Sequence, residues 1–190
     1  MKGHQQRNLR MQTVESSTSE SRNLSHQNDI VGLILEDHKR LKELIKIMKD
    51  TDKEETARQD AFAEFAPALI CHAKPEEQTL YVYMKSKEDL RAEGFEGDVE
   101  HQLADQLVEE IMRTDDNDLW SARVKVLAEL VEHHIEEEES ELLPDFKKNS
   151  QSNERDVLGA KFIDLKTDLL AKGATDSPHE NKLTGYDETH

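Results

Sequence analysis

The chain has 190 residues, enough for one ordinary domain with tails, and its 42 acidic residues outnumber its 25 lysines and arginines, which gives a net charge of −17. This balance excludes nucleic acid and anionic membrane surfaces as expected partners, because both require clustered basic side chains. Cys71 is the only cysteine, which excludes an internal disulfide and thiolate metal clusters.

The two ends of the chain are polar and lack apolar periodicity. Residues 1–28 are rich in Ser, Gln, Asn and Arg and contain no apolar core of a secretion signal, and residues 173–190 are similarly polar. We expect a disordered or loosely attached N-terminal tail and a flexible C-terminal tail. No stretch approaches the ~18–20 apolar residues of a membrane span, so we expect a cytoplasmic protein.

Long amphipathic helices are predicted between the tails. The first begins at Asn28 or Asp29, either of which can serve as N-cap. The second runs from about residue 54 to 89 and is expected to kink, because Pro67 and Pro75 each remove a backbone donor.

Glycines and acidic turns separate the later helices. The third helix is expected to begin after "EGFEGD", whose two glycines indicate a break, and the fourth after "TDDND". Short links between long amphipathic helices make neighbours antiparallel. The sequence therefore predicts an all-α fold, an up-down-up-down four-helix bundle over residues 29–150, with a further helix over residues 151–172 lying against it.

Each of the four bundle helices carries one histidine on its apolar face, and two of these are followed by a glutamate one turn later. A single such histidine is more often a hydrogen-bonded core residue than a ligand. Four in four helices are a different matter, because a buried carboxylate without a partner must shift its pKa or find a cation. The candidate residues are His38, His72, Glu76, His101, His134 and Glu138.

The His–x3–Glu spacing suits a metal site, because residues four apart lie one above the other on a helix. An imidazole and a carboxylate so placed reach the same ion, or the carboxylate bridges two ions ~3.5–4 Å apart. The motif occurs twice, in "HAKPEEQTLY" and in "HIEEEESELL", which indicates two similar halves.

The fourth helix contains two adjacent histidines, and its apolar stripe indicates which of them faces the core. The stripe through His134 continues through Glu138 to the apolar Leu142, whereas the stripe through His133 stays acidic. We therefore predict that His134 faces inward, and that His133 lies on the outer rim or contacts a ligand from outside.

The motifs together resemble the hemerythrin family in its HHE cation-binding form, over about residues 29–148. They are Asp-His, His-x3-Glu-Glu-x2-Leu, Glu-His and His-x3-Glu-Glu-x2-Leu-x-Pro, in chain order. The resemblance implies four terminal nitrogen ligands, His38, His72, His101 and His134, and two iron ions bridged by Glu76 and Glu138. Imidazole and carboxylate without thiolate suit iron or manganese, and they also accept zinc.

Two positions depart from the oxygen-carrying members of that family or interrupt a motif. Asp105 stands where those members have a second histidine in the third helix. Asp105 could bind a metal, accept a hydrogen bond from a ligand imidazole, or face the solvent. Pro75 is either a tolerated kink or a bend that aims Glu76 at the metals. Tyr83 lies on the predicted inward stripe, and Cys71 is expected to be a packed small residue.

These features favour a non-haem di-iron protein that binds or senses O2, NO or iron, with a diatomic gas or peroxide as its partner. With only four histidines, the site resembles iron-centre repair and sensing members more than reversible oxygen carriers. One alternative is a di-iron enzyme that acts on peroxide or NO, or repairs iron centres. Another is a metal-free helical interaction module.

Overall fold

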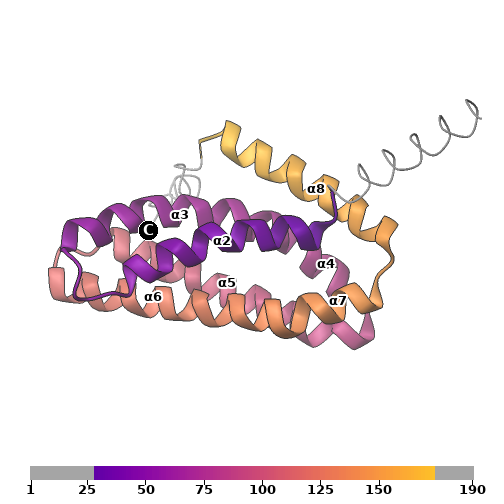
Figure 1. The fold of residues 1–190 in the computed structure, drawn as a ribbon, viewed down its shortest axis with the longest axis horizontal. Helices are drawn as coiled ribbons and strands as arrows, with labels where there is room; N and C mark the ends of the chain where they lie inside the picture. Colours follow the sequence, from indigo (N-terminus) through magenta and orange to yellow (C-terminus); the bar gives the residue numbers. More distant parts are fainter. Residues whose placement is uncertain (1–27, 174–190) are drawn as a thin grey trace, which may run out of the picture.

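A computed structural model describes residues 28–173, so the predicted tails, residues 1–28 and 173–190, fall almost wholly outside the described residues. Within this range the chain forms only helices and no strand, which confirms the all-α class. Figure 1 shows the long helices side by side, with a final helix laid across them. No helix in the described range is long and apolar enough to cross a membrane.

The first bundle helix, α2 (Ile30–Met48), begins at Asp29, whose carboxylate accepts a hydrogen bond from the Val31 backbone N–H at 3.0 Å. This satisfies one of the free donors at the helix start. Its apolar face is buried along the predicted stripe, which consists of Ile34, His38, Leu41, Ile45 and Met48.

The second predicted helix is divided in two. Helix α3 (Glu55–Gln78) contains both Pro67 and Pro75, and α4 (Leu80–Lys85) follows after Thr79, which has non-helical angles (φ −124°, ψ −80°). The Thr79 hydroxyl donates to the Pro75 carbonyl oxygen at 2.6 Å. The chain thus departs from the helix just after the His–x3–Glu motif, and this changes which later side chains face the core.

The third helix, α5 (Arg91–Met112), follows a short 3-10 turn, η1 (Glu88–Leu90), and runs straight through Gly94 and Gly97. The predicted break at these glycines was therefore wrong. Both are buried where α5 approaches α4: a Cβ on Gly97 would lie 2.5 Å from Tyr81 Cζ, and one on Gly94 would lie 3.0 Å from Met84 Cβ. The glycines permit close packing rather than a turn.

The fourth helix has three parts: α6 (Asn117–Glu137), a π-helical turn η2 (Glu138–Leu142) and α7 (Leu143–Asn149). Pro144 has no N–H with which to continue the regular ladder, and a π turn adds one residue per turn. The residue that faces the core after the motif is consequently Leu143, at 2% exposed, instead of the predicted Leu142.

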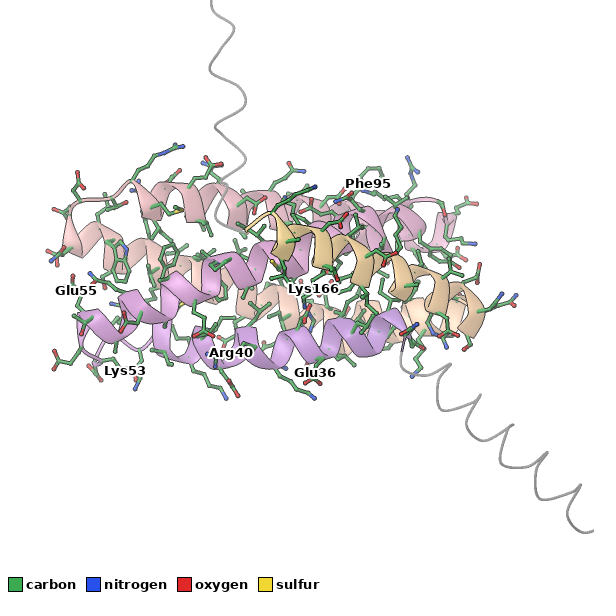
Figure 2. All side chains as sticks on the ribbon, turned by 90° about the horizontal axis from the view of Figure 1, so that it is seen from above. Glu36, Arg40, Lys53, Glu55, Phe95 and Lys166 are labelled. Atoms are coloured by element: carbon green, nitrogen blue, oxygen red, sulfur yellow. The ribbon has the colours of Figure 1, made fainter. Side chains whose placement is uncertain are left out.

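Two apolar clusters fill the bundle. One gathers α2, α3, α5 and α6 around residues such as Phe65 and Leu127, and the other lies at the opposite end around Tyr81 and Phe146. Along the chain the candidate metal residues stand near the boundary between the two clusters, with His134 still flanked by Val131 and Ile135 of the first. Most charged side chains lie outside, as Glu36, Arg40, Lys53 and Glu55 show in Figure 2, whereas Arg58, Arg155 and the two candidate glutamates are buried.

The last helix, α8 (Ser152–Ala171), begins at a capping box formed by Gln151 and Glu154 and lies across α2 and α3 (Figure 1). It is held by ion pairs from Arg155 to Asp29 (2.8 Å) and from Lys166 to Asp37. Phe162 adds its ring to the second apolar cluster. This is the additional C-terminal helix that the sequence predicted.

Candidate metal centre

The six candidate side chains meet in the middle of the bundle. They come from every bundle helix: His38 from α2, His72 and Glu76 from α3, His101 from α5, His134 from α6 and Glu138 from the start of η2. None of them is more than 4% exposed. Burying so many polar side chains costs desolvation free energy, which hydrogen bonds, ion pairs or a bound cation inside the core must offset.

The imidazoles turn their Nε2 atoms toward the two glutamates. Glu76 Oε2 lies 3.3 Å from His72 Nε2 and 3.8 Å from His101 Nε2. Glu138 Oε2 lies 3.2 Å from His38 Nε2 and 3.6 Å from His134 Nε2. Each glutamate is thus approached by two imidazoles, one from its own helix and one from another.

The donor atoms form three overlapping groups in which all members lie within 4.8 Å of one another. The groups are His38 with His72 and Glu138; His72 with Glu76 and His101; and Glu76 with His134 and Glu138. Together they contain the six candidate residues and no others. Within the described residues, several of these atoms are buried without a hydrogen-bond partner: Nε2 of His38 and His72, both oxygens of Glu76, and Oε2 of Glu138. Buried nitrogen and oxygen atoms without hydrogen-bond partners can act as ligands of a cation at the centre.

The outer Nδ1 atom of each imidazole faces a carboxylate from a neighbouring helix. The pairs are His38 with Glu139 (3.1 Å), His72 with Asp37 (3.7 Å), His101 with Glu77 (3.4 Å) and His134 with Glu100 (2.6 Å). The carboxylate of α2 serves α3, that of α3 serves α5, that of α5 serves α6, and that of η2 returns to α2. The contacts form a closed ring around the bundle.

This ring has a chemical consequence. At His38 and His134 the carboxylate lies within hydrogen-bond distance of Nδ1, which favours a proton on that side and directs Nε2 at the cluster. Sequence reasoning did not assign these four acids, although their letters stand in the motifs: Asp37 and Glu100 precede a histidine, and Glu77 and Glu139 follow a glutamate. Which carboxylate faces which imidazole depends on how each helix is rotated relative to its neighbour, and the sequence does not show this rotation.

Three of the four outer carboxylates also hold a lysine. Lys166 pairs with Asp37, Lys74 with Glu77 at 2.9 Å, and Lys42 with Glu139 at 2.7 Å. The pKa values of these three acids lie below their ordinary range: burial would raise them, but hydrogen bonds from the histidine and the lysine outweigh it. Glu100 has no lysine or arginine partner within the described residues. The ring is therefore charge-balanced on three sides and negative on the fourth.

The two central glutamates differ in their electrostatics. Burial raises the pKa of Glu76 well above its ordinary value, and the nearby Glu138 carboxylate raises it further. Burial acts on Glu138 as well, but His134 and His38 outweigh it and hold the pKa of Glu138 below its ordinary range. Without a cation, the first proton taken up by the pair belongs on Glu76.

The histidines divide in the same way. Burial lowers the pKa of His72 to about 4, so this imidazole stays neutral and able to bind a metal. For His134, burial acts downward but the carboxylates of Glu138 and Glu100 prevail and raise the pKa. In the absence of a cation, the positive charge that Glu138 needs therefore comes from His134.

Tyr81 is a site residue that the sequence did not single out. Its buried hydroxyl donates to Glu138 Oε1 at 2.8 Å and lies 3.4 Å from Nε2 of both His101 and His134. The predicted inward position of Tyr83 was wrong: Tyr83 is half-buried and packs edge-on against Phe146. The irregular backbone at Thr79 shifts the register, and so exchanges the two tyrosines.

The remaining predicted positions lie outside the cluster. His133 is 64% exposed and pairs with Glu137 at 3.3 Å, so the structure turns His134 inward and His133 outward, as predicted. Asp105 lies outside the three donor groups and pairs with Lys74 at 2.5 Å. Cys71 is a packed small residue, and burial raises the pKa of its thiol.

Comparison with known families agrees with this geometry. The model of the hemerythrin HHE cation-binding domain matches residues 29–146, well over half of the chain. Comparison with curated proteins and with solved structures gives no match. The matched segment contains all six candidate residues and ends before α8. The chain belongs to the hemerythrin HHE cation-binding domain family.

Proposed function

We propose that the chain is a non-haem di-iron protein that binds or senses O2 or NO. The observation that best supports two ions is the overlap of the three donor groups, because Glu76 and Glu138 each belong to two of them. A carboxylate shared between groups is suited to bridge two ions ~3.5–4 Å apart. The six proposed ligands contain no thiolate, which suits iron, with manganese or zinc as substitutes.

Iron(II) with an open coordination position supplies the affinity for a diatomic gas or a peroxide. The chain supplies the surroundings. Apolar clusters at both ends of the centre keep bulk water away. The outer carboxylates hold the imidazoles in place. The Tyr81 hydroxyl, beside Glu138 and two of the histidines, is placed to hydrogen-bond a small polar ligand.

A second candidate is a di-iron enzyme that decomposes peroxide or reduces NO. Tyr81 favours it, because burial and the Glu138 and Glu76 carboxylates raise the pKa of its hydroxyl and keep it protonated. A hydroxyl that stays protonated can donate a hydrogen bond to negative charge that develops on a bound oxygen or nitrogen species. Tyr81→Phe distinguishes the two candidates: an enzyme loses turnover of peroxide or NO, whereas a binding protein keeps its gas-binding stoichiometry.

The test begins with elemental analysis of protein produced with iron. We expect about two iron ions per chain, since the six proposed ligands form overlapping rather than single groups. Absorption spectra of the reduced protein before and after O2 or NO then report ligand binding, and turnover assays with peroxide and NO report an enzyme. One metal or fewer at full occupancy contradicts the binuclear centre, and no metal at all leaves the interaction module.

A matched pair of variants tests the assignment of the fourth helix. His134→Ala removes a side chain that is 4% exposed and faces Glu138, so we expect most of the metal to be lost. His133→Ala removes a side chain that is 64% exposed and lies one residue away, so the metal content should stay near wild type. Equal losses in the two variants would show that His134 is not a ligand.

A further inference from the structure

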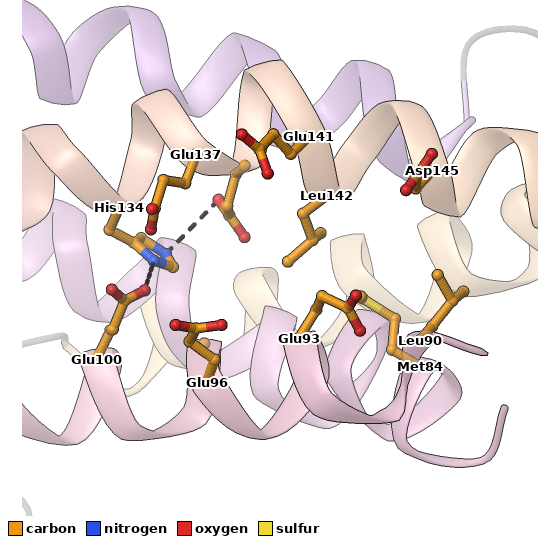
Figure 3. Close-up of a pocket in the computed structure, with 12 residues that line it drawn as sticks. Met84, Leu90, Glu93, Glu96, Glu100, His134, Glu137, Glu141, Leu142 and Asp145 are labelled. Carbon is orange, nitrogen blue, oxygen red and sulfur yellow. Dashed lines mark hydrogen bonds and ion pairs between the residues drawn. The ribbon is translucent and has the colours of Figure 1, made fainter. Parts of the chain in front are cut away.

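An acidic pocket leads from the surface to the metal centre on the side of the ring that lacks a lysine. It lies between α5 and the α6–η2–α7 helix and has a volume of about 120 Å³, room for several water molecules. Figure 3 shows Glu93, Glu96 and Glu100 on one wall and Glu137, Glu141 and Asp145 on the other. No lysine or arginine is among the residues that line it.

The inner end of the pocket belongs to the centre itself. His134 and Glu138 are both part of its lining. Glu138 is 1% exposed, and its Oε2 atom makes no hydrogen bond within the described residues. Nearer the mouth, Glu93 Oε2 is also buried without a hydrogen-bond donor. Two carboxylate oxygens without donors, one at the end of the pocket and one along it, call for a cation rather than for a neutral or anionic ligand.

On the other sides of the centre a lysine offsets the charge of the outer carboxylate. Lys42, Lys74 and Lys166 stand over the outer carboxylates on those sides, so an approaching ion meets positive charge there. Glu100, on the pocket side, pairs with His134 and with no lysine or arginine among residues 28–173. A cleft lined by one sign of charge in low-dielectric surroundings raises the local concentration of counter-ions. The arrangement of charged side chains therefore favours the approach of divalent cations through this acidic pocket.

We propose that this acidic pocket is the route by which Fe2+ enters the centre, with its outer carboxylates collecting the hydrated ion and Glu138 receiving it. Oxygen donors suit a hard divalent ion that still carries water, and the imidazoles inside replace that water. Glu138 is suited to the transfer because it both lines the pocket and belongs to two donor groups. The inference rests on the proposed iron-binding function and concerns how the ion arrives.

The experiment measures the rate of metal uptake separately from the final content. Metal-free chain is mixed with Fe2+ without oxygen, uptake is stopped at timed points with a chelator, and the bound iron is measured. The pocket variant carries Glu93→Gln, Glu96→Gln and Glu141→Gln. The control carries Glu43→Gln, Glu64→Gln and Glu129→Gln, three exposed acids outside the pocket that change the net charge equally. Thermal melts verify that both are folded.

We expect the pocket variant to load about tenfold more slowly at low ionic strength, with the difference narrowing in high salt, while the control loads at the wild-type rate. Both should reach the wild-type iron content. A single variant, Glu96→Lys, places a cation in the pocket and should slow uptake as well, whereas Glu129→Lys should not. These variants provide a second reading if the triple variant folds poorly.

Three outcomes overturn the route. Pocket variants that load at the wild-type rate show that ions enter elsewhere. A slowdown equal in pocket and control variants shows an effect of net charge alone. A lower final content in the pocket variant shows that these acids are ligands rather than a path. If wild-type chain binds no iron at all, the proposed function fails instead, so the two failures are distinguishable.

Discussion

Glu76 and Glu138 occupy matching places in the two motifs, but in the metal-free chain their surroundings shift their pKa values in opposite directions. Glu138 faces two imidazoles and accepts from Tyr81, whereas the oxygens of Glu76 are buried without a hydrogen-bond donor in the described residues. Glu76 is therefore the side chain whose charge costs most when no ion is bound.

This difference predicts opposite effects of the same substitution. In metal-free protein, Glu76→Gln should increase the free energy of unfolding at neutral pH by on the order of 1 kcal/mol or more. Glu138→Gln should decrease it, because the imidazoles lose their negative partner. Chemical denaturation with chelator present measures both, and a loss of stability in Glu76→Gln would contradict the raised pKa of Glu76.

The pH dependence follows from the sign of the shift. The pKa of Glu76 in the folded chain lies above its ordinary value of 4.5, so folding takes up a proton. The stabilisation is complete below the unfolded pKa and is lost as the pH rises through the folded pKa. As the pH rises above the ordinary value of 4.5, the free energy of unfolding of metal-free wild type should thus fall more steeply than that of Glu76→Gln.

Gly97 provides a second residue-scale prediction. A methyl group there would lie 2.5 Å from Tyr81 Cζ, so Gly97→Ala must displace the ring that donates to Glu138. We expect a loss of about 1–3 kcal/mol in stability and weaker metal binding. Gly32→Ala is the control, since nothing lies within 4 Å of its added Cβ and α2 should gain about 0.5–1 kcal/mol. Thermal melts and metal titration compare the two.

At the scale of elements, periodicity predicted the helices and their order, because long apolar stripes were present. It did not predict the non-helical Thr79, the π turn of η2 or the continuation of α5 through Gly97. Each of these depends on contacts between helices. The six core side chains were found because they replace apolar residues in a stripe, whereas Tyr81 and the outer carboxylates depend on helix rotation and on the shift after Thr79.

Helix α8 lies outside the family match but contacts the centre through Lys166, Asp37 and His72. Lys166→Met removes the cation that holds Asp37 against the imidazole, so metal affinity should fall about tenfold, at the low end for outer contacts of metal ligands. Lys161→Met on the same helix loses only a bond to the Gln78 carbonyl oxygen. Metal titrations that give equal affinities for the two variants would mean that α8 does not act on the centre.

At the scale of the whole molecule, a bound cation should couple the four bundle helices. Metal that binds only the folded chain adds stability by mass action, ~4 kcal/mol when the free ion is a thousandfold above its dissociation constant. Thermal melts with and without chelator measure this. We expect a lower midpoint after the metal is removed, because two glutamates and four histidines then share one core. An unchanged midpoint after demonstrated removal would contradict a buried cation centre.

The ring of outer carboxylates also sets an order of events during synthesis. Among the described helices α2 leaves the ribosome first, but the partners of its side chains are made later: Glu139 follows His38 by 101 residues, and Lys166 follows Asp37 by 129 residues. At ~5–20 residues per second, the two members of the Asp37–Lys166 pair are made roughly 6 to 26 s apart, for a separation of 129 residues. The ring itself closes once Glu139 has emerged, and Lys166 of α8 reaches Asp37 only afterwards. A nascent chain that stops before α8 has all six proposed ligands but lacks the lysine that pairs with Asp37, so we expect it to bind iron more weakly than a chain that includes α8.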